Sequence, residues 1–274
     1  MKRTLLIIND NSGSANVVGE EKIVESLQSA GFDIAQLLKI PEDELPTRVA
    51  VEQGGFDTVV ILSGDGTISA LCKALAGWDG AILPLPGGTM NLLCRKLHGD
   101  LLLPELLLCL STSTLEPAPV PVIYAAGFEV LTGLIAGPST EWGKVREGLR
   151  ERDVVSLVQQ VPEAWAGTVE GKSVGIEGRE GGYPAIFVEP YTGTELSVIA
   201  FKADGIGDML SHGIAWLRRD FRDGPNDDLG VMDEVTIIDD DHEVGLLVDG
   251  EQKSTTSPLI CRAGMSSVKF VSLG

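Results

Sequence analysis

Two short glycine-rich turns carry the residues of this sequence that are best suited to chemistry. The first turn reads Ser-Gly-Asp-Gly-Thr at 63–67; it follows the apolar run 59–62 and precedes a helical pattern. Such a turn presents backbone N–H groups at the start of a helix, where the helix dipole also favours an anion. Phosphate is therefore the expected ligand. Asp65 stands among these donors, and the simplest use of a carboxylate there is to hold Mg²⁺.

The second turn reads Gly-Gly-Thr-Met-Asn at 87–91 and follows another apolar run, 81–84. Because ligands of open α/β sheets bind at the carboxyl ends of strands, both turns are expected to face one crevice. The hydroxyls of Thr67 and Thr89 can cap their helices and donate to a phosphate. The alternative, two tight turns without a ligand, stays open. Neither turn has the lysine of a P-loop or the glycine spacing of a dinucleotide-binding fingerprint, so both motifs are excluded.

The elements that position these turns follow from the apolar pattern. Strand-like runs alternate with helical patterns in the first part of the chain, at 4–8, 33–38, 58–62 and 81–84. This order indicates a doubly wound α/β domain over residues 1–118. Three prolines within 117–121 mark a domain boundary. Beyond it, short β-rich pieces between Gly, Pro and Asp turns predict an antiparallel β domain over residues 119–257. We leave open whether 258–274 returns to the first domain.

The composition limits the partners and the location of the protein. The chain has 274 residues, 43% of them apolar, with 40 acidic against 21 basic side chains and a formal charge of -19. This charge disfavours binding to a phosphate backbone, so no nucleic acid partner is expected. Four cysteines lie far apart without CxxC pairs, which argues against a zinc site or a disulfide scaffold. The sequence shows no secretory signal and no apolar run of membrane-spanning length, so we expect a cytoplasmic protein.

Four motifs together resemble the diacylglycerol kinase catalytic-domain family, the bacterial lipid kinases that include relatives of sphingosine kinase. They are Asn-Asp-Asn-Ser-Gly at 9–13, the two turns at 63–67 and 87–91, and Leu-Val-Asp-Gly-Glu at 247–251. The resemblance implies a two-domain kinase in which ATP lies between an α/β domain and an antiparallel β-sandwich domain. The residues that it places at the nucleotide are Asn9, Asn11, Ser12, Gly13, Ser63, Gly64, Asp65, Gly66, Thr67, Gly87, Gly88, Thr89 and Asn91.

The resemblance also implies the catalytic groups. Asp65 would hold Mg²⁺ together with the phosphates of ATP. Asp249 or Glu251 of the last motif would accept the proton of the acceptor hydroxyl, and which of the two does so is left open. Apart from the resemblance, Asp249 and the glycine after it are also typical of a hairpin turn between two strands.

The expected activity is transfer of the γ-phosphate of ATP to a lipid hydroxyl, with diacylglycerol first and a sphingoid base or related lipid second. The sequence departs from the family pattern at Asp10, at Ser63, and at Met90 with Leu92. These departures motivate an alternative, a catalytically degenerate regulator that binds nucleotide. A kinase of a soluble acceptor such as NAD shares the Gly-Asp-Gly-Thr turn, but the Thr-Met-Asn-Leu-Leu continuation and the late Asp-Gly-Glu favour lipid kinases.

Further segments suggest a second metal site and a membrane contact. The acidic turn at 225–233 resembles one that holds a structural Mg²⁺ in some family members, here through Asp228; a solvated acidic turn is the alternative. The segments 142–152 and 216–222 each join a Trp to several cations in a predicted helix. Either they contact the inner face of a membrane or they pack on the β domain. Homodimer formation is left open.

Overall fold

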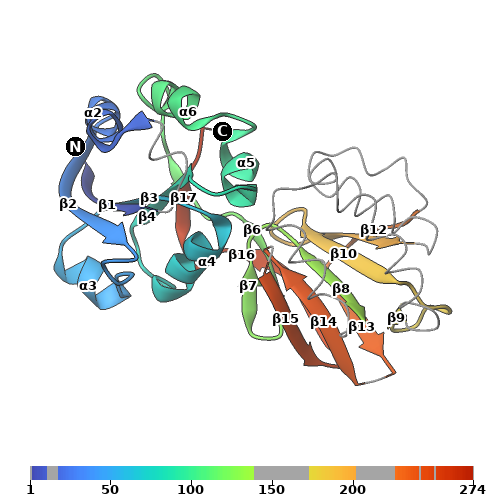
Figure 1. The fold of residues 1–274 in the computed structure, drawn as a ribbon. Coiled ribbons are helices and arrows are strands. Elements are labelled where there is room, and N and C mark those ends of the chain that lie inside the picture. The colour runs from blue at the N-terminus through green and yellow to red at the C-terminus, as the bar shows by residue number, and fades with distance from the viewer. Residues whose placement is uncertain are drawn as a thin grey trace. The chain divides into compact units, whose positions relative to one another are not determined.

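The computed structural model describes residues 2–10, 18–138, 173–201, 226–240, 242–249 and 251–273. The chain divides into two compact units, which Figure 1 colours by residue number. The first unit comprises Met1–Val120 together with Ser266–Gly274, and the second comprises Pro121–Met265. Among the described residues, no helix is long and apolar enough to cross a membrane.

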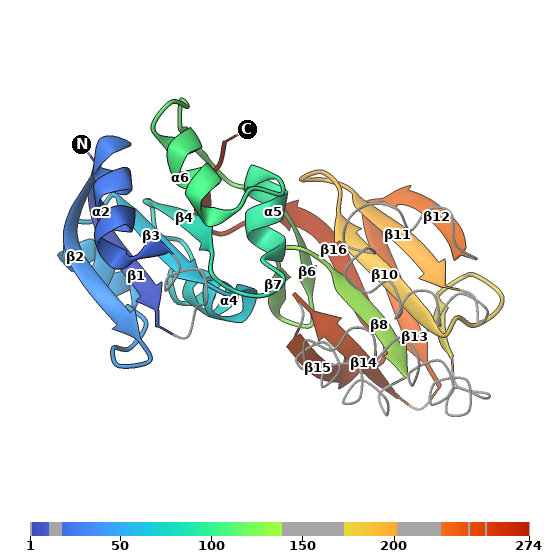
Figure 2. The ribbon, with the colours of Figure 1, turned by 45° about the horizontal axis from the view of Figure 1, so that its top comes forward.

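The first unit is built on one six-stranded sheet in the order β2-β1-β3-β4-β17-β5. The strands pair in parallel, except that β5 runs antiparallel to β17. They are β1 (Lys2–Asn9), β2 (Phe32–Ile40), β3 (Thr58–Ser63), β4 (Ala81–Pro86), β5 (Pro117–Ala118) and β17 (Lys269–Val271). The helices are α2 (Glu20–Ser29), α3 (Arg48–Gln53), α4 (Asp65–Ala74), α5 (Leu92–His98) and α6 (Leu103–Leu110). Figure 2 shows the same elements from a second direction.

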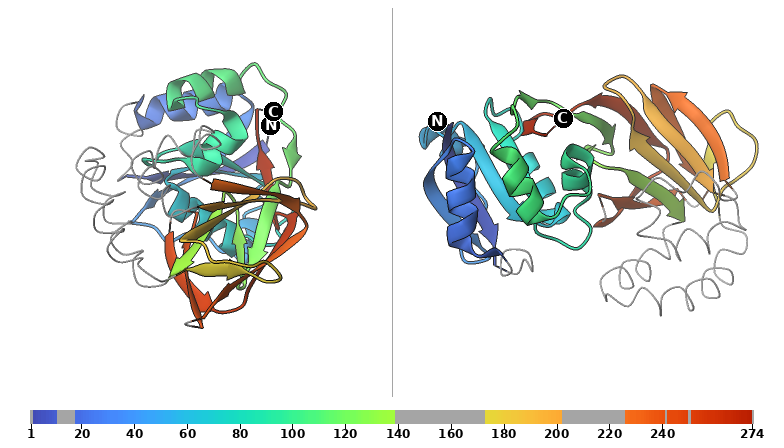
Figure 3. Two further views of the ribbon diagram at one scale, coloured as in Figure 1. Left: turned by 90° about the vertical axis from the view of Figure 1, so that its right-hand side faces the viewer. Right: turned by 90° about the horizontal axis from the view of Figure 1, so that it is seen from above.

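The inner strands β1, β3 and β4 are buried on both faces, as their continuous apolar sequence predicts. Figure 3 shows α2 and α6 side by side over one face, and Figure 1 shows α3 and α4 on the other. Alternate positions of the strands, such as Leu6 and Leu62, join side chains of α2 and α6 in one hydrophobic cluster. The intervening positions, such as Leu5 and Ile61, are also buried. Polar groups that could meet a ligand therefore lie at the ends of these strands.

Two prolines, Pro84 and Pro86, lie in β4 although this strand is inside the sheet. β17 pairs with β4 only as far as Ile82, so prolines beyond that point interrupt no pairing with β17. The carbonyl oxygen of Pro84 instead lies 3.1 Å from Nε2 of His98 at the end of α5. Because a carbonyl can only accept, Nε2 carries the proton of this hydrogen bond. The imidazole thereby anchors α5 to the strand that leads into the second glycine turn.

His98 is buried, and its Nδ1 has no hydrogen-bond partner. Burial lowers the pKa of the imidazole to about 4, and the hydrogen bond to Pro84 opposes this shift only in part. The ring is therefore neutral near pH 7, with its proton on Nε2.

The described residues of the second unit form two antiparallel sheets, in the orders β12-β11-β10-β8-β14-β15 and β7-β6-β16-β13-β9. The strands of the first are β8 (Leu134–Pro138), β10 (Ala185–Pro190), β11 (Leu196–Phe201), β12 (Asn226–Met232), β14 (Glu243–Val248) and β15 (Glu251–Thr256). Those of the second are β6 (Pro121–Ala125), β7 (Phe128–Val130), β9 (Val174–Ile176), β13 (Glu234–Asp239) and β16 (Leu259–Met265).

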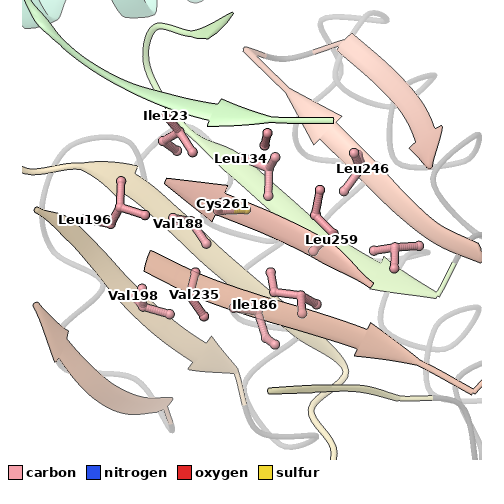
Figure 4. Close-up of a cluster of buried hydrophobic side chains, with 14 of the residues drawn as sticks. Ile123, Leu134, Ile186, Val188, Leu196, Val198, Val235, Leu246, Leu259 and Cys261 are labelled. Atoms are coloured by element: carbon pink, nitrogen blue, oxygen red, sulfur yellow. The ribbon is translucent and has the colours of Figure 1, made fainter. Parts of the chain in front are cut away.

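Side chains from both sheets form one hydrophobic cluster, part of which Figure 4 shows. On β13, for example, Val235 and Ile237 are buried in this cluster, whereas Glu234 is exposed. This alternation is typical of an antiparallel sheet with one buried face. The α/β part of the chain is therefore followed by a part rich in antiparallel β strands, as the sequence predicts.

The chain returns to the first unit later than residue 258. β16 pairs with β6 and β13 inside the second unit, and only β17 pairs with β4. The return therefore begins at Ser266. The segments 142–152 and 216–222, predicted to be helices with Trp and basic residues, lie outside the described residues.

We expect His98 to make the stability of the protein depend on pH. Its pKa is about 4 in the folded protein and 6.5 in the unfolded chain, so the unfolded chain binds the proton first as the pH falls. Stability is therefore complete above about pH 6.5 and is lost by about 3 kcal/mol as the pH falls to about 4. His98→Gln keeps a donor for Pro84 without titrating. Urea unfolding at about pH 7.5 and at about pH 4.5 gives the free energy of unfolding at each pH. Between the higher and the lower pH, this free energy should fall less in the variant than in wild type. Equal losses would contradict the assignment.

Candidate active site

The two glycine-rich turns start side by side at the carboxyl edge of the first sheet. β3 ends at Ser63 and β4 ends at Pro86, and these two residues are partners in the parallel pairing. The N–H of Gly87 donates a hydrogen bond of 3.1 Å to the carbonyl oxygen of Ser63. The ladder between the strands therefore continues into the second turn.

The backbones of the two turns are in contact at Gly64 and Gly88. A Cβ added to Gly88 would lie 2.6 Å from Cα of Gly64, closer than real Cβ atoms approach backbone. A Cβ added to Gly64 would lie 3.4 Å from Cα of Gly88, which is near an ordinary contact. Gly88 is therefore required by the close approach of the turns, whereas the backbone at Gly64 leaves room for a methyl group.

Helix α4 begins directly at the first turn. Gly64 is its N-cap residue, in extended conformation, and no side chain caps the helix there. The N–H of Ile68 donates to the carbonyl oxygen of Gly64 at 3.2 Å and so closes the first helical turn. The N–H groups of Gly66 and Thr67 precede that bond, at the positively polarised end of a helix of 10 residues. An anion is favoured at this position.

Asp65 links the first turn to the helix that follows the second. Its Oδ1 accepts a hydrogen bond of 3.1 Å from the N–H of Leu93, in the first turn of α5. Asn91, the N-cap residue of α5, makes no capping hydrogen bond of its own, so the cap of α5 comes from the other turn. Burial and, after it, the charge of Asp65 raise the pKa of the Cys94 thiol, which stays protonated.

The amide groups of the two glycines in the second turn are used within the protein. Gly87 donates to Ser63, and the N–H of Gly88 donates to Oδ1 of Asn91 at 2.7 Å. The sequence pattern predicts N–H groups without a protein acceptor at both turns. The second turn differs from this prediction, because the side chain of Asn91 accepts the hydrogen bond of the Gly88 N–H. Thr89, which follows, is exposed.

Asn9 lies beside the first turn, as the last residue of β1. Its Nδ2 donates a hydrogen bond of 3.1 Å to Oγ of the buried Ser63. The serine that departs from the family pattern thus has a partner in the first motif. The other residues predicted there to contact the nucleotide lie outside the described residues; they are Asn11, Ser12 and Gly13.

Asp249 of the last motif is buried in the second unit, in the connection between β14 and β15. Val248 pairs with Glu251, so this is a two-residue hairpin connection, and Asp249 has a left-handed backbone with φ 47. Its carboxylate accepts hydrogen bonds from the N–H of Leu131 at 3.1 Å, the N–H of Thr132 at 2.8 Å and the hydroxyl of Thr132 at 2.7 Å. The local geometry is therefore that of the hairpin turn.

The environment of Asp249 has two opposing effects on its carboxyl group. Burial raises the pKa of this carboxyl, and the hydrogen bonds from Thr132 and Leu131 oppose the rise. The same bonds fix residues 131–132, which connect β7 to β8. The part of Asp249 in proton transfer stays a prediction.

Glu251 differs from Asp249 in being exposed. It is the first residue of β15, and its Oε2 lies 3.9 Å from Nζ of Lys253. The ammonium group of Lys253 in turn lies 4.5 Å from the centre of the Phe128 ring. Because it is exposed, the Glu251 carboxylate can contact a substrate from solvent without breaking a buried hydrogen bond.

Asp228, the other predicted metal ligand, lies exposed on β12. Its Oδ1 accepts a hydrogen bond of 2.9 Å from the N–H of Gly230, where the pairing of β12 with β11 shifts by one residue. Within the part of the chain that the structure describes, no group of three or more His, Cys, Asp or Glu side chains is arranged to hold a metal ion. Metal binding by Asp65 and by Asp228 stays a prediction.

Comparison with known proteins finds a family model that matches the α/β part of the chain. Residues 3–120, which include both glycine turns, match the model of the diacylglycerol kinase catalytic domain. No curated protein sequence matches the chain.

Solved structures from Bacillus anthracis str. Sterne share the fold of the chain. Two of these structures are of a candidate diacylglycerol kinase; compared with this chain, they have TM-scores of 0.68 and 0.66 and sequence identities of 19% and 17%. A third, of a diacylglycerol kinase, has a TM-score of 0.62 with 16% identity. Each match covers 99% of this chain and 97% of the other. At such identities the similarity establishes the fold alone.

Several partners of the family motifs are backbone groups that carry no signal in the sequence. The N–H of Leu93 caps its helix through Asp65, and the N–H groups of Leu131 and Thr132 hold Asp249. Every residue except proline has such a donor, so residue type cannot mark these positions.

We expect Gly88→Ala to destabilise the first unit by about 1–3 kcal/mol, because its Cβ would meet the backbone of Gly64. Gly64→Ala is the matched control, whose Cβ would lie 3.4 Å from the facing Cα and should cost less than about 1 kcal/mol. Urea unfolding followed by circular dichroism measures both values. Similar losses for the two variants would show that the turns are not in contact.

We expect Asp249→Ala to lower the free energy of unfolding by about 3 kcal/mol, because the buried N–H of Leu131 and the partly buried N–H of Thr132 lose their acceptor. Alanine is also strained at φ 47. Asp249→Asn should cost less, since asparagine keeps the backbone conformation and one acceptor. Glu251→Gln, the exposed control, should stay within about 0.5 kcal/mol of wild type. Chemical denaturation measures all three variants, and wild-type stability of Asp249→Ala would rule out the anchoring role.

Proposed function

We propose that the chain is an ATP-dependent kinase that transfers the γ-phosphate to the hydroxyl of a lipid. Diacylglycerol is the first acceptor to test, and a sphingoid base or related lipid is the second. The observation that carries this proposal is the backbone contact of Gly64 and Gly88, at the strand ends of a diacylglycerol kinase catalytic domain. Two glycine turns joined at the carboxyl edge of a parallel sheet suit a nucleotide phosphate chain.

The start of α4 supports the placement of the phosphates. No side chain caps this helix, so an anion would meet the N–H groups of Gly66 and Thr67 that have no acceptor within the helix. The hydroxyl of Thr67, in the same turn, is suited to donate to a phosphate oxygen, as is that of the exposed Thr89.

Asp65 is the residue best placed to hold Mg²⁺ with those phosphates. It is the acidic residue in the first turn of α4. Mg²⁺ is commonly bound by one or two carboxylates together with substrate phosphates and water, so a dense acidic cluster is not required. When bound, the ion would neutralise charge on the transferred phosphoryl group.

Glu251 is the better of the two late carboxylates for accepting the hydroxyl proton. Both oxygens of Asp249 accept hydrogen bonds from buried or partly buried donors, and proton uptake by the carboxylate would disturb these bonds. Glu251 is exposed at the start of β15. In this proposal Asp249 shapes the hairpin that carries Glu251, and Glu251 acts as the general base.

A second candidate function is a nucleotide-binding regulator without transferase activity. The second turn uses the amides of Gly87 and Gly88 internally, and Leu92 stands where the family commonly has an acidic residue. Such a protein would bind ATP at α4 and leave lipids unphosphorylated.

We expect the purified protein to transfer label from radiolabelled ATP to a lipid in mixed micelles, with diacylglycerol, sphingosine and soluble NAD tested separately. Asp65→Ala should lower the rate by about 100-fold or more, because the carboxylate that would hold Mg²⁺ is lost and the ion no longer neutralises the phosphates. Transfer to NAD alone would contradict the lipid assignment. Binding of ATP without transfer to any acceptor would favour the regulator.

Asp65→Asn is the control that separates the two roles of this residue. Asparagine keeps an oxygen that can accept the hydrogen bond from Leu93 but carries no charge. Its stability should match wild type, while its activity should fall with that of Asp65→Ala. Full activity in Asp65→Asn would exclude a role in holding Mg²⁺.

A further inference from the structure

The side chain of Asn91 is engaged by its own turn at both ends. Its Oδ1 accepts a hydrogen bond of 2.7 Å from the N–H of Gly88, and its Nδ2 donates one of 2.9 Å to the carbonyl oxygen of Gly88. One carboxamide thus satisfies both polar backbone groups of the residue that touches Gly64.

The position of Asn91 demands both a backbone conformation and a side chain of specific chemistry. Its backbone is left-handed, with φ 50 and ψ 44, a region that asparagine enters more readily than most residues. The two hydrogen bonds between the Asn91 side chain and the backbone of Gly88, called the clasp below, also need one acceptor and one donor on a short side chain. Glycine meets only the first demand, and aspartate supplies the acceptor without the donor.

The clasp acts together with two further hydrogen bonds of the second turn. The N–H of Gly87 is bound to Ser63, and the N–H of Leu93 is bound to Asp65. Between these two points, the bonds of Asn91 to Gly88 hold the middle of the turn. The middle is also where the backbone must approach Gly64 most closely.

We propose that Asn91 is a positioning residue, which presets the second turn against the first and does not itself bind the nucleotide. This assignment replaces the direct nucleotide contact expected for Asn91, and its link to catalysis rests on the proposed kinase function. Without the clasp, nucleotide binding must order the turn as well as occupy it. Affinity for ATP then falls, while the reaction in the filled site proceeds at the wild-type rate.

Hydrogen exchange of the Gly88 amide in the nucleotide-free protein tests the clasp without any use of activity. In Asn91→Gly, which keeps the backbone conformation and loses both hydrogen bonds, this amide should exchange about tenfold faster or more. Asn91→Asp keeps the acceptor and should give a smaller increase. Thermal unfolding by circular dichroism establishes that both variants fold. Unchanged exchange in folded Asn91→Gly would overturn the proposal.

Steady-state kinetics test the link to the reaction. Asn91→Gly should raise KM for ATP about tenfold and leave kcat within about twofold of wild type. A fall in kcat with unchanged KM would overturn the proposal, since it would show that Asn91 acts on the transition state. If wild type has no transferase activity, the kinase proposal fails, and the dissociation constant of ATP takes the place of KM: about a tenfold increase in Asn91→Gly supports the positioning role, and no change overturns it.

Discussion

The close approach of Gly64 to Gly88 is the constraint on which the site of the first unit depends. A side chain at position 88 would prevent the backbones from coming so near, and the approach exists because β3 and β4 are parallel neighbours that end together. The surrounding hydrogen bonds preserve it: Ser63 holds the start of the second turn, and Asp65 holds the helix after it. Hydrophobic packing sets the positions of the strands, and a few polar contacts then set the turns between them.

Helix α5 shows how this constraint extends beyond the turns. Its first turn is bound by Asp65, and its last residue, His98, donates to a carbonyl oxygen of β4 where β17 no longer accompanies that strand. A buried histidine with an unpartnered nitrogen is a costly way to satisfy one carbonyl. As a result, α5 is fixed at both ends, and the second turn is held at the start of this helix.

Three carboxylates of the family motifs serve different purposes because their surroundings differ. Asp249 is buried and fully engaged in joining two connections of the second unit, whereas Glu251, two residues on, is exposed. Asp65 is half-buried and joins two turns. A motif identifies the residue types, but burial and hydrogen bonding decide which carboxylate is available for proton transfer or for a metal ion.

The sequence by itself indicated the inner strands, since short apolar runs such as 59–62, bounded by turn residues, are typical of a strand covered on both faces. It also located both glycine turns and the change of architecture near 117–121. Helix α6 is not predicted from the sequence, although its Pro104 lies in the first turn, where proline is favoured. Only the tertiary structure decided the point of return at Ser266, the cap that Asp65 provides, and the burial of Asp249. Those features depend on backbone groups brought together from distant parts of the chain, and a backbone group is the same whatever residue carries it.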